Sequence, residues 1–180
     1  MTDALADPIA PIDTETDTTP VADKVDALRE ALDEVRVVML TAVHEGLHSR
    51  PLTLLNLDQA GGLWFLVDGN EPWVQALIDR PMVDVSADLH ADGRWVSVSG
   101  VAVLSDDRDV VRELWTPAAK AFWESEDDPA ICVLRVDPTV VDVWHSAPSA
   151  VGRVLAIGKA IITGDSDAAG HHDHLVFAEL

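Results

Sequence analysis

Apolar residues follow two periods along the chain, and the order of these periods predicts a mainly β protein. From Val21 to Leu32 they recur at helical spacing behind Thr19, a suitable N-cap, and Pro20, so a helix is expected up to about Asp33. Later segments are β-branched and alternate between apolar and polar positions, as strands do. These segments are residues 36–43, 47–57, 63–67, 82–89, 94–104, 131–136 and 140–145, from which we expect about six strands in short hairpins.

Turn and helix signals separate these segments. Turns are expected where Gly, Asp and Pro gather, and further helices where apolar residues return to helical spacing. Ser105 is the expected N-cap of one helix, Pro117 starts the next, and a short helix before Arg80 and Pro81 is expected to bury Ile78. The expected turns are residues 44–46, 58–62 and 137–138, and the last helix is expected at residues 151–162.

Strands in short hairpins with helices at the periphery exclude a doubly wound parallel sheet, which needs regular alternation of strands and helices. Pro51 marks an edge strand or a bulge, because proline has no N–H for a β-ladder. The simplest arrangement is a small closed or half-closed antiparallel barrel, mainly β with peripheral helices (α+β).

The strongly negative charge of the chain excludes some classes of binding partner. The 180 residues hold 12 Lys and Arg against 32 Asp and Glu, a formal net charge of −20 at pH 7. Phosphate backbones and anionic membrane surfaces repel such a protein, so we expect neither nucleic acid nor membrane as a partner. The 48% of hydrophobic residues nevertheless indicates a folded core, and the length suits one domain.

The first twenty residues differ from the rest in composition. They carry five acids, three prolines and no base, which predicts a disordered acidic tail at residues 1–20 in front of a domain at residues 21–180. This segment lacks the basic and apolar regions of a signal peptide, and no apolar run is long enough to span a membrane. A single cysteine, Cys132, forms no internal disulfide and is interpreted as core filling; together these features predict a cytoplasmic protein.

Six stretches stand in an order that resembles a known family. They read VVML, HSRPL, LWFLVDGNEPWVQAL, DGRWVSVSG, LWTPAAKAFW and VGRVLAIGKAIITG. In this order the chain resembles the pyridoxamine 5′-phosphate oxidase-like family of FMN-binding split barrels, in its general stress protein 26-like branch. The resemblance runs from about Val21 to the C-terminus. It implies a six-stranded antiparallel split β-barrel of Greek-key type that forms a homodimer.

The resemblance also implies a cofactor, FMN or in some members FAD, held in a groove between the subunits. Arg50 matches the arginine that binds the flavin phosphate, and a guanidinium fork suits a dianionic phosphate. The candidate cofactor-binding residues are Arg50, Pro51, Leu52, Thr53, Phe65, Leu66, Val67, Trp73, Trp95 and Lys120. No GxSxG, Walker, GxGxxG or HExxH motif is present, so no catalytic residue is assigned.

At two positions the chain departs from the family pattern. Val67 stands where the family usually has a threonine, and Trp73, preceded by Pro72, stands where it usually has a lysine. Hydrogen bonds to charged groups contribute about 1.5–3 kcal/mol each, so their loss weakens phosphate binding by roughly two to four orders of magnitude. Lys120 or Arg94 would have to supply the missing cation.

Two of the candidates also have structural interpretations. Arg50 meets either a ligand or a carboxylate, Asp84 or Asp88, on a neighbouring strand, because an unpaired buried guanidinium is costly. Trp73 fills the core, plugs the phosphate pocket or stacks on a ring. Trp95 either faces the flavin region, as the matching position does in the resembling family, or packs in the core, which is the more frequent place of a strand tryptophan.

The remaining candidate functional residues are an aromatic cluster and several histidines. Residues 115–123 resemble the family's helical lid, and we interpret their aromatic cluster as a packing or dimer surface. His145 is interpreted as structural. The histidines at 171, 172 and 174 are interpreted as a polar loop, because ligands so close in sequence need a fourth from elsewhere, so no metal site is assigned.

Two functions of different classes follow. In the first, the protein binds a flavin, and flavin-dependent oxidoreductase activity is a further role that this binding allows. In the second, a non-enzymatic split-barrel dimer has lost flavin phosphate binding through Val67 and Trp73 and acts as a stress-related module for another small molecule or a protein partner.

Overall fold

The computed structural model describes residues 18–89, 93–146 and 170–177. The helix expected at residues 151–162 and most of the expected tail lie outside these ranges. In chain order the elements are α1 (Val21–Ala31), β1 (Val37–Val43), β2 (Leu47–Thr53), β3 (Asn56–Leu57), β4 (Leu63–Asp68), α2 (Pro72–Ala76), β5 (Met82–Leu89), β6 (Arg94–Ser105), α3 (Arg108–Leu114), η2 (Pro117–Ala121, a 3₁₀ helix), β7 (Ile131–Ser146) and β8 (Gly170–Val176).

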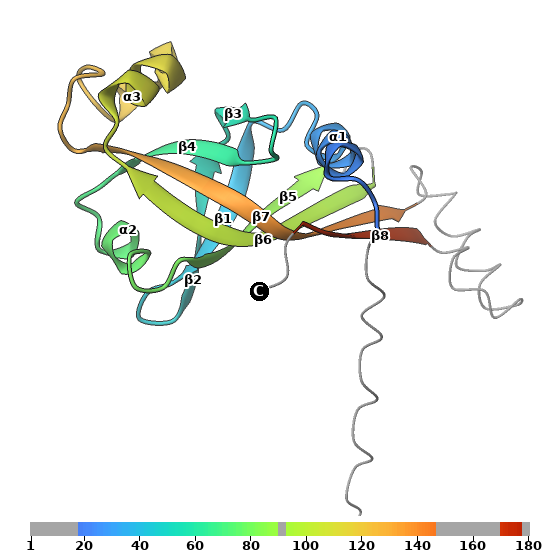
Figure 1. The fold of residues 1–180 in the computed structure, drawn as a ribbon. Coiled ribbons are helices and arrows are strands. Elements are labelled where there is room, and N and C mark those ends of the chain that lie inside the picture. Colours follow the sequence, from blue (N-terminus) through green and yellow to red (C-terminus); the bar gives the residue numbers. More distant parts are fainter. Residues whose placement is uncertain (1–17, 90–92, 147–169, 178–180) are drawn as a thin grey trace, which may run out of the picture.

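The strands form one curled antiparallel sheet that makes a half-barrel (Figure 1). Its order is β2-β1-β5-β6-β7-β4-β3, and β8 also pairs with β7. The predicted fold class, mainly β with peripheral helices, is therefore confirmed. The expected number of about six strands is too low, because the sheet of the described residues has eight. Residues 131–136 and 140–145 join in β7, residues 47–57 divide into β2 and β3, and the C-terminal segment adds β8.

Alternation along the strands separates a buried face from an outer face. Val38, Leu40 and Ala42 of β1 are at most 1% exposed, whereas Val37 and Met39 are 59% and 40% exposed. Each strand residue points to the face opposite its chain neighbours, so these two sets lie on opposite faces of the sheet. The buried set packs with Leu28 of α1 and with Phe65 of β4, both fully buried.

β7 is one continuous strand, and the turn expected at residues 137–138 is wrong. The register with β6 shifts between Ser99 and Gly100: Ser99 lies opposite Val140 and Gly100 lies opposite Pro138. The extra residue, Thr139, donates a hydrogen bond from Oγ1 to the Ser99 carbonyl at 3.0 Å. A bulge of this kind accommodates a proline without ending the strand. A Cβ on Gly100 would lie 2.5 Å from the Asp137 carbonyl oxygen, so the close approach here requires glycine.

The helices begin close to their expected positions. α1 starts at Val21 with Pro20 as its N-cap, one residue later than predicted. Asp107, and not Ser105, caps α3, because its carboxylate accepts from the Asp109 and Val110 amides while Ser105 Oγ accepts from the Asp107 amide. Ile78, expected to be buried, is 67% exposed beyond the end of the short helix α2. None of the described helices is long and apolar enough to cross a membrane.

Candidate functional site

A cleft of about 390 Å³ lies where β2, β4, α2 and η2 approach one another. Its volume is in the range of about 300–1,000 Å³ that is usual for small-molecule sites. The walls are residues 50–53, Leu55, residues 66–68, Glu71, Trp73, Thr116, Ala118, Ala119, Phe122 and Trp123. Most of this lining is apolar, and two of its side chains are tryptophans.

Arg50 of β2 is the cation of the cleft wall. Its guanidinium lies over the Trp73 ring, 4.1 Å from the ring centroid. Its Nε is buried and has no hydrogen-bond partner among the described residues. Burial lowers the pKa of Arg50, while the carboxylate of Glu71 acts in the opposite direction. A guanidinium stays charged under these conditions. The cleft wall therefore carries a positive charge that is fixed on Trp73 and whose Nε–H is available to an acceptor.

The register explains why Arg50 does not pair with Asp84 or Asp88. Arg50 lies opposite Leu40 in the β1–β2 pair, and Leu40 lies opposite Val85 in the β1–β5 pair. Residues directly opposite one another share a face, so Arg50 is on the buried side of the sheet and the two aspartates of β5 are on the outer side. Asp84 instead accepts a hydrogen bond from Ser97 Oγ at 2.6 Å. The expected alternative, an ion pair with either aspartate, is not found within the described part of the chain.

Trp73 is only 7% exposed and belongs to the main core cluster. It is also a wall of the cleft and the surface on which Arg50 stacks. The interpretation of Trp73 as a core residue is therefore confirmed, while its interpretations as a plug of the phosphate pocket and as a surface that stacks on a ring stay predictions. Arginine stacking on an indole contributes about 0.5–2 kcal/mol, which helps to fix the guanidinium at the wall.

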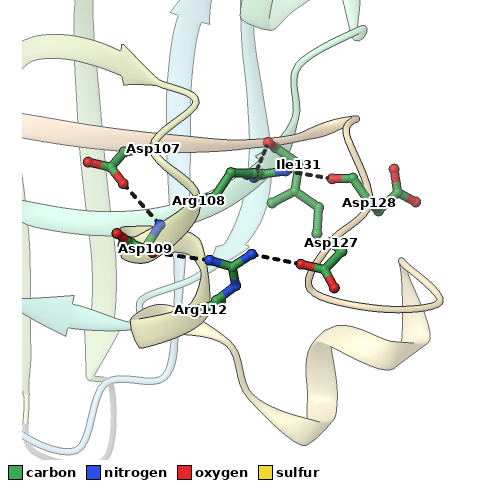
Figure 2. A network of polar contacts seen from close by, with 7 residues as sticks. All are labelled: Asp107, Arg108, Asp109, Arg112, Asp127, Asp128 and Ile131. Carbon is green, nitrogen blue, oxygen red and sulfur yellow. Dashed lines mark hydrogen bonds and ion pairs between the residues drawn. The ribbon is translucent and has the colours of Figure 1, made fainter.

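The segment between β6 and β7 covers the cleft, and a polar network holds it in place (Figure 2). Arg108 donates to the carbonyl oxygens of Asp128 at 2.8 Å and Ile131 at 2.9 Å, so it ties the start of α3 to the start of β7. Arg112 pairs with the carboxylates of Asp109 and Asp127, each at 3.0 Å. These contacts position η2 and the aromatic residues that follow it.

Most of the predicted site residues meet in the cleft, and three do not. Seven of the ten line it: Arg50, Pro51, Leu52, Thr53, Leu66, Val67 and Trp73. Phe65 is fully buried in the core. Trp95 lies on β6 opposite Asp88 and Trp144, and Lys120 is exposed on η2 outside the lining. Arg94 donates to the Glu30 carbonyl of α1, so neither of the cations considered as a replacement is in the cleft of this chain.

Sequence reasoning missed the acidic part of the wall. Asp68 and Glu71 line the cleft beside Arg50. Asp68 accepts from the Asn70 amide at 2.8 Å, which forms the turn between β4 and α2. Asp68 and Glu71 both belong to the DGNEP segment, which lies within one of the six stretches matched to the family, but neither was assigned to the site. Two carboxylates at this place reduce the attraction of the cleft for a phosphate.

Cys132 has no features of a nucleophile. Burial raises the pKa of its thiol, and Sγ lies 3.4 Å from the Ser105 carbonyl oxygen. A thiol with a raised pKa is protonated at neutral pH and reacts slowly.

The histidines interpreted as a polar loop lie instead in β8, where residues 170–176 pair with β7. Their sequence is too polar for a strand to be recognised from alternation alone. Leu175 and Phe177 pack against the main core cluster and fix this end of the strand.

A curled antiparallel half-barrel with an apolar cleft under a helical cap defines a split-barrel protein with room for a small molecule. The family described as pyridoxamine 5′-phosphate oxidase like matches residues 23–167, and the chain belongs to this family.

Relatives and solved structures agree with this assignment. The chain is 28% identical to protein bli-3 of Neurospora crassa, over 88% of this chain and 82% of that protein. A general stress protein 26 from Jannaschia has the same fold, with a TM-score of 0.64 and 20% identity over 87% of this chain and 99% of that one. The general stress FMN/FAD binding protein from Xanthomonas citri has a TM-score of 0.59 and 26% identity over 69% of this chain and 89% of that one.

Proposed function

We propose that the cleft binds a flavin, FMN with FAD as the second choice, in a split-barrel protein of the general stress protein type. The observation that carries the proposal is Arg50, held on Trp73 at the wall of an apolar cleft with a buried Nε that has no acceptor among the described residues. A buried donor without a partner costs about 1–3 kcal/mol, and an anionic ligand would remove this cost. The Xanthomonas citri protein, described as FMN/FAD binding, supports the choice of ligand.

The residues present fit the two ends of a flavin unequally. Leu52, Leu66 and Trp123 provide an apolar wall that excludes water from an aromatic ring system. The phosphate end would meet Arg50, opposed by Glu71. A flavin bound in this way supplies redox chemistry, while the chain binds and orients it. We therefore propose oxidoreductase activity as a second step, which depends on flavin binding.

The contribution of the phosphate can be tested by comparing the affinities for FMN and for riboflavin, which lacks the phosphate. One charged hydrogen bond, about 1.5–3 kcal/mol, corresponds to a preference for FMN over riboflavin of about 10- to 100-fold. The absorption spectrum of the purified protein comes first, followed by titration of FMN, FAD and riboflavin against tryptophan fluorescence. Arg50→Ala should remove the preference for FMN while riboflavin still binds. Arg36→Ala, an exposed arginine outside the cleft, is the matched control.

Two results would contradict the flavin proposal. One is a protein that binds none of the three flavins at high micromolar concentration. The other is an Arg50→Ala variant that keeps the full preference for FMN over riboflavin.

The second candidate function is a non-enzymatic module that has lost the phosphate site. It is favoured by Val67, which is 3% exposed and has no hydroxyl, and by the buried Trp73. Trp73→Lys is a poor test, because it would bury an ammonium group beside the Arg50 guanidinium. Val67→Thr is close to isosteric and tests the lost donor directly. If that donor is the cause, the variant binds FMN more tightly than the wild type; equal affinity would reject this cause.

Homodimer formation and a cytoplasmic location complete the proposal. Met39, Met82 and Val103 are 40%, 41% and 46% exposed on the outer side of β1, β5 and β6, which supports an apolar contact surface for a second copy. Sedimentation of the full chain should then give twice its mass of 19.4 kDa.

A single cysteine without a disulfide partner in the chain supports the proposed location in the cytoplasm, which is a reducing compartment.

A further inference from the structure

Three metal-ligating side chains converge on the outer side of the β7–β8 pair, away from the cleft. Asp142 Oδ1 lies 2.8 Å from His172 Nε2 and 2.7 Å from His174 Nδ1. The three ligand atoms all lie within 4.8 Å of one another. The aspartate and the histidines are 30 and 32 residues apart in the sequence, so only the strand pairing brings them together.

Register and alternation explain this convergence. His172 and His174 are two apart in β8, so their side chains share a face. Asp142 lies directly opposite His174, and Trp144 lies directly opposite His172. The Trp144 indole stacks on the His172 ring with a centroid distance of 5.0 Å and an interplanar angle of 4°, which fixes the ring plane.

The neighbouring positions of the same two strands point the other way. His145 Nε2 and Asp173 Oδ2 are 3.2 Å apart and belong to the alternate positions of β7 and β8. Alternation therefore assigns these two side chains to the opposite face of the strand pair. This separates them from the three converging ligands and provides a matched control on the same strands.

We propose that Asp142, His172 and His174 bind a divalent transition metal ion, with zinc as the ion of first choice. Two imidazoles and one carboxylate are a usual zinc ligand set, and a water molecule would complete the tetrahedron. With metal–ligand distances of about 2.0–2.1 Å, the ligand atoms of a tetrahedral site lie about 3.3 Å apart. The hydrogen-bonded pairs at 2.7 and 2.8 Å would therefore separate by about 0.5 Å, and the two histidine nitrogens, which lie within 4.8 Å of each other, would adopt the same spacing. Each ligating ring nitrogen would bind the ion through its lone pair, so the proton that it holds in the hydrogen bond moves to the other nitrogen of the same ring, and the ligand is a neutral imidazole.

The site is separate from the flavin cleft. Asp142 lies ten residues along β7 from Cys132, the partner of Val67, which at about 3.3 Å per residue is about 30 Å. Figure 1 shows β8 at the opposite end of β7 from α3. Because its ligands come from two strands, the ion would attach β8 to β7 and stabilise the pairing of the C-terminal strand.

The test uses the full chain, with any affinity tag removed and metal stripped by a chelator. Calorimetric titration with Zn²⁺ should give one site per chain, and thermal unfolding should shift to higher temperature when Zn²⁺ is added. His172→Gln, His174→Gln and Asp142→Asn should each lower the affinity about tenfold or more and remove the thermal shift. His145→Gln, on the opposite face, should retain both. Circular dichroism before the titration confirms that each variant is folded.

Co²⁺ gives a second readout that does not depend on a variant. The wild-type protein should develop the visible absorption bands of tetrahedral Co²⁺ with nitrogen ligands. A wild type that binds neither ion would overturn the proposal, as would ligand variants that bind Zn²⁺ as tightly as the wild type. Either result would identify the three side chains as a hydrogen-bonded cluster only. Failure of flavin binding does not affect these measurements, because the two sites share no residue.

Discussion

Asp58 organises the turn between β3 and β4 with both of its carboxylate oxygens. Oδ1 accepts from the amides of Ala60 at 2.8 Å and Gly62 at 2.9 Å, and Oδ2 accepts from Trp64 Nε1 at 2.9 Å. Arg135 Nε lies 3.3 Å from Oδ2. Burial by itself raises the pKa of Asp58, but these hydrogen bonds and the nearby guanidinium outweigh it and hold the pKa below its usual value.

The lowered pKa predicts how this turn responds to acid. A carboxyl group whose folded pKa is below its unfolded value, about 3.9, stabilises the fold above that value. This contribution is lost as the pH falls through the lower, folded pKa. Asp58→Asn should therefore be less stable than the wild type at pH 7, and its stability should fall less steeply below about pH 4. Urea unfolding at a series of pH values measures both effects.

Asp79→Asn is the control for this prediction, because Asp79 is exposed. It should leave both the stability at pH 7 and the acid profile close to those of the wild type. An Asp58→Asn variant with the acid profile of the wild type would contradict the assigned role of the carboxylate.

At the same scale, the candidate site shows what a sequence can and cannot predict. Arg50 and its neighbours in β2 are local in sequence, so one matched stretch was enough to place them together at the cleft. The face on which Arg50 lies depends on pairing with β1 and β5, which no local pattern contains. Lys120 directly follows lining residues of η2 but is itself exposed outside the cleft. The sequence pattern does not show which of two neighbouring residues in a short helix points into a cleft.

At the scale of elements, the strands were predictable wherever one face is apolar. β1, β5 and β6 have clear alternation, and their expected bounds differ from the observed ones by one residue at most. The turn expected at residues 137–138 failed because the bulge opposite Gly100 absorbs the proline, a compensation that lies on another strand. β8 was missed because its outward positions are histidines and its pairing partner is distant in sequence.

The covering segment between β6 and β7 gives a prediction at this scale. Arg108 donates to two backbone carbonyls, and each hydrogen bond from a charged group contributes about 1.5–3 kcal/mol, with less than full additivity for the two. Arg108→Ala should therefore destabilise the protein by about 2–3 kcal/mol and loosen η2. Urea unfolding measures the first effect, and the rate of tryptic cleavage at Lys120 measures the second.

Arg112→Ala is the matched variant in the same network. Both of its carboxylate partners are mostly exposed, with side-chain exposures of 94% for Asp109 and 70% for Asp127. Exposed pairs contribute little, so this variant should unfold and be cleaved much like the wild type. If the two variants behaved alike, Arg108 would not be the residue that holds the segment.

For the whole molecule, the dominant electrostatic feature is the net charge of −20. Self-repulsion at this charge opposes the compact state, and it acts over the full diameter of the domain. The described ion pairs act over a few ångströms: Arg29 and Asp26 are 2.8 Å apart, and Arg135 Nη2 and Asp137 are also 2.8 Å apart. Salt screens the long-range repulsion much more than these short contacts, so stability should increase with ionic strength.

The prediction is a higher unfolding temperature in salt. Raising NaCl from about 20 mM to about 300 mM shortens the screening length from about 20 Å to about 6 Å. A gain of about 1 kcal/mol would raise the unfolding temperature by about 2–4 °C for a chain of this size. Calorimetric scans with a chelator present keep metal binding out of the comparison, and choline chloride at equal ionic strength should give the same shift if screening is the cause. A fall in the unfolding temperature would mean that the short ion pairs, and not the net charge, dominate the electrostatics of the fold.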